Sequence, residues 1–243
     1  MAYRRAGNPL AFGGRVPAVV GGLIVATVLV SLVAAVGDQM NYRVRALLLL
    51  QPAAVWEGEV WRLVTWVLVE ENPLNLLFGG LVLYWFGRDL VEAWGDRKFL
   101  ATWFGVPAAA AVLTCLLALA WPRLAASWSS GFWVALDVLV ICWGLVHPFR
   151  QILLYFALPV SGKALVAITV GGTVLFALFS SITAFVPHLL AEGLAWLHAS
   201  GKGPGSWLRR LRLPRRRGRG RFEVIHADRD PDRRWLNRSA VPR

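Results

Sequence analysis

Residues 16–37 read VPAVVGGLIVATVLVSLVAAVG and carry no charged side chain, which makes this stretch decisive for the fold. A transmembrane helix needs about 20 consecutive apolar residues, so the stretch is long enough to cross a bilayer. Arg4, Arg5 and Arg15 precede it, as basic residues precede the apolar core of a cleaved signal peptide. That core spans only about 7–15 residues in a signal peptide, so we expect a retained transmembrane helix.

The chain is far more apolar than a soluble protein. Of its 243 residues, 57% are hydrophobic and 16% are charged, whereas soluble domains average about 45–50% and about 25%. The apolar residues gather in long uncharged runs, which excludes a soluble enzyme, a disordered protein and a disulfide scaffold. Cys115 and Cys142 lie inside such runs, so we expect buried free thiols, with no metal and no other cofactor.

Five further runs predict helices that cross the membrane. Asn72 followed by Pro73 is a typical helix start, because asparagine caps a helix N-terminus and proline fits its first turn. Residues 38–72 are mixed in polarity and contain several tryptophans, so we expect an interfacial loop with one or two amphipathic helices. Residues 152–159 are too few to cross and predict a strand-like or surface segment. The predicted crossings after the first are residues 74–94, 99–122, 124–146, 164–183 and 187–200, the last beginning at Pro187.

The expected fold class is therefore all-α, a polytopic membrane protein with a six-helix transmembrane bundle over residues 16–200. Lys and Arg are enriched in cytoplasmic segments, and their distribution places residues 1–15 and residues 201–243 in the cytoplasm. The composition, rich in Ala, Val, Leu and Arg, suggests a bacterial inner membrane.

The C-terminal tail, residues 201–243, holds most of the net charge. It contains 14 Lys and Arg against 4 Asp and Glu, whereas the first 200 residues contain 12 against 10. We expect a disordered tail that touches anionic lipid, since basic residues near a membrane surface are attracted to it. Nucleic acid is not an expected partner, because the tail has few aromatic side chains on which bases could stack.

Three polar residues within the predicted crossings are candidates for function. Asp137, His188 and Glu192 would be costly in hydrocarbon, so they are expected to face the interior of the bundle. Ser129 and Ser130 lie near the start of the predicted helix that contains Asp137. Helical spacing places Ser130 and His188 at a similar depth, with Asp137 about 10 Å further in.

These residues allow three interpretations. A serine and a histidine at one depth could act as nucleophile and base. The serines could instead cap a helix, while Asp137 and Glu192 only fix helix packing through hydrogen bonds. Proton or ion handling by the three ionisable side chains is the third interpretation.

Short motifs then occur in the order that is typical of the rhomboid family, the intramembrane serine proteases and their inactive relatives. The chain resembles this family over about residues 55–200, and the resemblance implies a six-helix membrane bundle. The matching pieces are GEVWRLVT at residues 58–65, NLLFG at 75–79, Gly87, Gly95 and Phe99, WSSG at 128–131 followed by Ala135 and Leu136, and HLLA at 188–191 followed by Ala195.

The resemblance implies Ser130 as nucleophile, His188 as base, and Asn75 as a hydrogen-bond donor to the oxyanion. Two departures weigh against catalysis: Gly79 stands at a second oxyanion position, and Trp128 stands where the motif has glycine. Loss of one oxyanion donor typically slows an enzyme about 10²–10³-fold.

An alternative register of the serine motif would put Trp133 at the serine position and leave no nucleophile. The sequence therefore favours a catalytically impaired or inactive rhomboid-like protein that binds transmembrane segments of other proteins. The alternative is an active intramembrane serine endopeptidase with a Ser130/His188 dyad, whose substrates are transmembrane segments.

Overall fold

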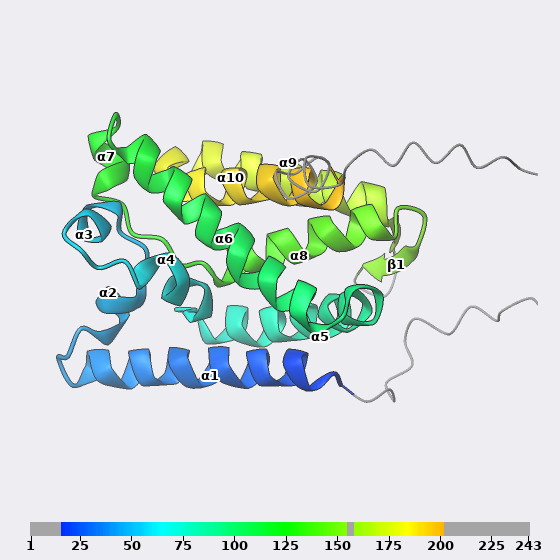
Figure 1. Ribbon diagram of the computed structural model, residues 1–243, viewed down its shortest axis with the longest axis horizontal. Coiled ribbons are helices and arrows are strands. Elements are labelled where there is room, and N and C mark those ends of the chain that lie inside the picture. Colours follow the sequence, from blue (N-terminus) through cyan, green and yellow to red (C-terminus); the bar gives the residue numbers. More distant parts are fainter. Residues whose placement is uncertain (1–15, 155–157, 202–243) are drawn as a thin grey trace, which may run out of the picture. The chain divides into compact units, whose positions relative to one another are not determined.

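The computed structural model describes residues 16–154 and 158–201, all of which belong to one compact unit. The predicted N-terminal segment 1–15 and the basic tail beyond Gly201 lie outside the described residues. Figure 1 shows the helices of this unit running back and forth along one direction. The long helices are α1 (Ala18–Gln39), α5 (Pro73–Trp94), α6 (Asp96–Ala118), α8 (Phe132–Val146), α9 (Gly162–Phe179) and α10 (Ile182–Ala199).

Shorter elements connect the long helices. Four of them occupy the stretch predicted as an interfacial loop with one or two helices, so that loop is more helical than expected. A two-stranded antiparallel hairpin confirms the strand-like segment predicted at residues 152–159. The short elements are α2 (Val44–Leu48), α3 (Pro52–Trp56), α4 (Arg62–Thr65), the 3₁₀ turn η1 (Trp66–Leu68), α7 (Pro122–Ala125), β1 (Gln151–Leu154) and β2 (Leu158–Ser161).

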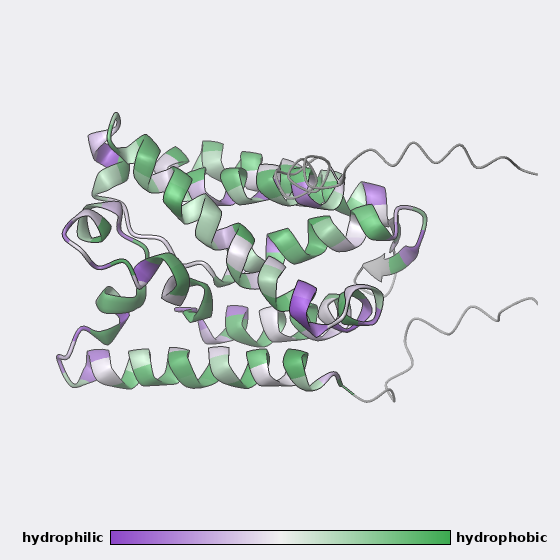
Figure 2. Cartoon of the chain, in the orientation of Figure 1, coloured by the Kyte–Doolittle hydropathy of each residue, from purple (hydrophilic) through white to green (hydrophobic). Residues whose placement is uncertain are grey.

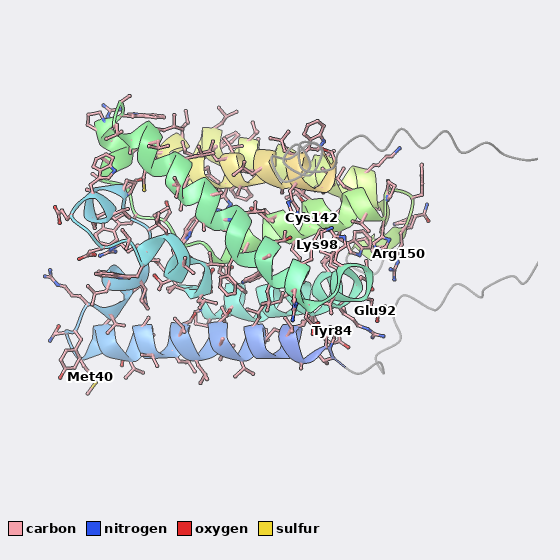
Figure 3. All side chains as sticks on the ribbon, viewed as in Figure 1. Met40, Tyr84, Glu92, Lys98, Cys142 and Arg150 are labelled. Carbon is pink, nitrogen blue, oxygen red and sulfur yellow. The ribbon has the colours of Figure 1, made fainter. Side chains whose placement is uncertain are left out.

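The prediction of an all-α polytopic membrane protein is confirmed. Among the described residues, α1, α5, α6 and α9 are both long enough and apolar enough to cross a bilayer, and α8 is an apolar helix of 15 residues. Hydrophilic residues gather at helix ends and in connections, while the helices are mostly apolar (Figure 2). Figure 3 places Met40 at one end of α1, with Lys98 and Arg150 toward the opposite end of the unit.

Helix α8 lies at the centre of the packing. It contacts α5, α6, α9 and α10, and ten of its 15 residues are buried. Its core side chains include the fully buried Phe132 and Trp143. Cys142 on α8 and Cys115 on α6 are buried free thiols, as predicted.

Two predicted helix boundaries were wrong. Helix α10 begins at Ile182, so Pro187 lies inside it instead of starting it. A proline this near the N-terminus removes only one backbone hydrogen bond, and transmembrane helices tolerate that loss. Helix α8 begins at Phe132, eight residues after the predicted start at residue 124, because the chain ahead of it is held in an extended conformation.

Glycines allow α8 and the start of α9 to approach closely. A Cβ atom added to Gly162 would lie 3.0 Å from the Gly144 carbonyl oxygen and closer still to that of His147. Neither backbone can yield without moving a helix, so the contact depends on the missing side chain.

Gly162→Ala should therefore lower the free energy of unfolding by about 1–3 kcal/mol, the usual cost of overpacking. Thermal unfolding in detergent would measure this loss. The matched control is Gly171→Ala in the same helix, where a Cβ meets nothing within 4 Å. Equal effects of the two substitutions would contradict the close approach.

Candidate functional site

The segment ahead of α8 is held against the interfacial loop by backbone hydrogen bonds. Ser129 forms a β-bridge with Leu50, with both N–H···O distances at 3.0 Å. The Gly131 N–H donates to the Trp66 carbonyl oxygen at 2.9 Å. These bonds explain why residues 126–131 do not join the helix that follows.

Ser130 lies in this extended segment, outside any helix. Its hydroxyl donates a hydrogen bond of 2.6 Å to the carbonyl oxygen of Val69. The prediction that Ser130 lies near the start of the helix that contains Asp137, within that helix, is wrong, because α8 starts only at Phe132. The alternative of a serine cap is also wrong, since Gly131 is the N-cap residue and no side chain caps α8.

His188 is paired with Asp137. Its Nδ1 lies 2.8 Å from Asp137 Oδ2, which joins α10 to α8. Both side chains are largely buried, with exposed fractions of 15% and 17%. The two residues therefore lie at one depth, and the predicted offset of about 10 Å was wrong because α10 starts five residues earlier than expected.

Glu192 lies one turn beyond His188 on α10 and is 3% exposed. Its Oε1 accepts a hydrogen bond of 2.6 Å from Thr173 on α9, while its Oε2 has no hydrogen-bond partner within the described residues. The candidate polar residues thus link three helices, α8, α9 and α10. No metal-binding group of three His, Cys, Asp or Glu side chains exists in the parts of the chain that the structure describes.

Asn75 is on the first turn of α5. Its Nδ2 lies 3.4 Å from Glu70 Oε1, which also accepts hydrogen bonds from the N–H groups of Glu71 and Asn72 at 3.1 Å each. Glu70 is itself buried. The Asn75 amide is therefore engaged in holding the start of α5.

Gly79 stands at the second oxyanion position that the resemblance implies, and side chains of α8 occupy the space beside it. A Cβ added there would lie 2.9 Å from Leu136 Cδ1 and closer still to the ring of Phe132. The space in which a polar side chain could act is thus occupied by apolar atoms.

The two tryptophans of the serine motif differ in their surroundings. Trp128 is 46% exposed, and the guanidinium of Arg62 lies 5.7 Å from the centre of its ring. Trp133 is half-buried on the first turn of α8, and its indole Nε1 has no hydrogen-bond partner among the described residues.

Sequence reasoning missed the partners of the candidate residues. Ser130 bonds a backbone carbonyl, for which no residue type gives a signal. Thr173 bonds Glu192 and Glu70 contacts Asn75, and the sequence indicates neither pairing beyond the polar nature of the residues. A further interaction was also missed: Asp89 Oδ2 accepts from Trp143 Nε1 at 2.9 Å and pairs with Arg150 at 2.7 Å.

Comparison with known families decides the chain's membership. Residues 21–198 match the model of a family described as "Eukaryotic integral membrane protein (DUF1751)". The chain belongs to this family. The match covers nearly all of the residues that the structure describes. No curated protein matches the chain.

Membership of this family supports an integral membrane protein. The family's description is eukaryotic, which contradicts the predicted bacterial inner membrane.

A polar side chain introduced at Gly79 should not fit the space beside it. Gly79→Asn would force an amide against Phe132 and Leu136, so we expect it to destabilise the protein by about 1–3 kcal/mol. Unfolding in detergent measures the loss. The neighbouring Gly80→Asn is the control, since a Cβ there meets only Ile24 Cγ2 at 3.8 Å. An asparagine tolerated equally at both positions would show that the Gly79 site is open.

Proposed function

We propose that this protein is a rhomboid-like membrane protein that binds transmembrane segments of other proteins without cleaving them. The observation that carries this proposal is the hydrogen bonding of the candidate dyad. The Ser130 hydroxyl donates to Val69, and the His188 Nδ1 faces Asp137. A nucleophile and its base need to be within hydrogen-bond reach of each other, and no hydrogen bond joins Ser130 to His188 among the described residues.

The oxyanion positions support the same proposal. Asn75 contacts Glu70, and the space beside Gly79 is occupied by Phe132 and Leu136. A site for acyl transfer requires donors aimed at the developing negative charge. The residues here favour packing over that chemistry.

Binding is favoured by one incompletely covered side of α8. Helix α9 packs on α8, α10 and β2, whereas α5 packs on α1, α6 and α8. Along one side, α8 presents partly exposed side chains in an otherwise buried element. A transmembrane segment could pack there through van der Waals contacts, as helices do in lipid.

Photocrosslinking tests this proposal. A photoreactive amino acid at Val140, on the partly exposed side of α8, should give discrete adducts with single-span test proteins in reconstituted bilayers. The matched control is the same amino acid at Leu29 on α1, which is 56% exposed. Mass spectrometry should locate the Val140 adducts inside the partner's transmembrane span.

The same samples separate binding from proteolysis. We expect no cleavage fragments, and equal adduct yields for the unchanged Ser130 and for Ser130→Ala. Fragments that disappear with Ser130→Ala would establish the endopeptidase. Equal adduct patterns from Val140 and Leu29 would reject binding at α8.

We also propose that the basic tail contacts anionic lipid on the cytoplasmic side, with both termini there. The proposal is supported by its 14 Lys and Arg against 4 Asp and Glu, since each basic residue near an anionic surface contributes about 1 kcal/mol.

A further inference from the structure

Three side chains form a partly exposed face on α8. Trp133, Asp137 and Val140 are spaced four and three residues apart, so they lie on one side of the helix. Every other residue from Phe132 to Gly144 is buried. We call these three side chains the open face of α8.

Helices α5, α9 and α10 border the open face. Phe132 and Leu136 of α8 pack against Gly79 of α5, and Asp137 pairs with His188 of α10. Gly144 lies seven residues beyond Asp137, on the same side of α8, and packs against Val166 of α9. A segment that contacts the open face would therefore lie beside these three helices.

Asp137 is the charged member of this face. Its Oδ2 is paired with His188, but its Oδ1 accepts no hydrogen bond among the described residues. The side chain retains 17% of its surface exposed. One carboxylate oxygen is thus available to a partner on the open face.

Apart from His188, helices α8, α9 and α10 offer almost no basic side chain to Asp137. Helices α8 and α10 contain Asp137 and Glu192 but no Lys or Arg, and in α9 the only one is Lys163, at its start. A carboxylate without a basic partner is costly in a membrane.

We infer that the transmembrane segment bound at the open face carries a Lys or Arg that pairs with Asp137. This inference rests on the proposed function and adds the chemistry of the partner. Asp137 is the sixth residue of α8, about 8 Å along the axis from Phe132. The basic residue of the partner should lie level with Asp137 when the segment packs alongside α8.

Host peptides provide the test. Single-span Leu/Ala peptides with Lys, Gln or Leu at the matching depth are reconstituted with the full-length protein, and binding is measured by energy transfer from a fluorophore at Ile168, an exposed residue of α9 outside the open face. The Lys peptide should bind at least about tenfold more tightly than the Leu peptide, because a hydrogen bond to a charged group contributes more free energy than a tenfold difference in affinity requires. The Gln peptide should bind with intermediate affinity.

Substitutions locate the effect. Asp137→Asn should remove the preference for Lys, whereas Glu192→Gln, at a buried side chain that bonds Thr173 of α9, should preserve it. Asp137→Lys should reverse the preference and favour a host peptide with Glu. Because the peptide series leaves the open face unchanged, a variant that fails to fold does not decide the result.

The outcomes distinguish a failure of this inference from a failure of the proposed function. Equal binding of the Lys and Leu peptides to the unchanged protein would overturn the inference and leave the proposed function standing. Failure of every peptide to bind would overturn both. A Lys preference that survives Asp137→Asn would also overturn the inference.

Discussion

Arg62→Ala should lower the free energy of unfolding by about 1.5–3 kcal/mol, the range for losing hydrogen bonds to a charged group. Arg62 is 3% exposed. Its guanidinium pairs with Glu59 and donates to the carbonyl oxygens of Ala46 and Leu49, the latter at 2.8 Å. One side chain thus holds the loop around α2 to the start of α4, and alanine would leave those acceptors unsatisfied.

Arg62→Lys should recover only part of that loss. The guanidinium presents several donors in a fixed plane, whereas an ammonium is a point charge that cannot serve all three acceptors in this arrangement. Reversible unfolding in detergent measures both variants. Arg123→Ala, at an exposed residue of α7, is the control and should change stability by less than about 0.5 kcal/mol. Equal losses at Arg62 and Arg123 would contradict the structural role of Arg62.

His188→Leu should cost about 3 kcal/mol, because it leaves the Asp137 carboxylate without its partner inside the membrane domain. Asp137→Leu leaves the imidazole unpaired and should cost less, since a neutral histidine is cheaper to bury than an ionised carboxylate. The double variant Asp137→Leu with His188→Leu should recover most of the loss, because apolar replacements of a buried pair are often near neutral.

A double-mutant cycle in detergent or bicelles measures this coupling. Losses that simply add in the double variant would mean that the Asp137–His188 contact contributes nothing of its own. Ser130→Ala is a useful companion, since it removes only the hydrogen bond to Val69 and should cost about 0.5–1.5 kcal/mol.

Local sequence signals predicted the helices well where they acted alone. Asn72 and Pro73 do start α5, and the Asn72 Oδ1 accepts from the Leu74 N–H at 2.9 Å. Gly95 ends that helix with a φ of 79°, a conformation that glycine adopts without strain. Long uncharged runs likewise located the crossings, because hydrocarbon demands continuous apolar sequence.

Local sequence signals predicted the wrong helix starts where segments far apart in the sequence contact each other. The late start of α8 depends on the pairing of Ser129 with Leu50, which no local pattern reveals. The early start of α10 moved His188 beside Asp137, although proline normally indicates a first turn. Both errors affected the candidate site, because its predicted geometry was measured from these two helix starts.

The most direct test of the central claim, that Ser130 is not an activated nucleophile, is labelling with a fluorophosphonate probe. Purified protein in bilayers is compared with Ser130→Ala and His188→Ala, with an active rhomboid protease as the positive control. Because the Ser130 hydroxyl donates its hydrogen bond to the Val69 carbonyl oxygen, we expect no labelling of any of the three proteins, while the control labels normally. Labelling that is lost with both substitutions would contradict the account and establish the protease.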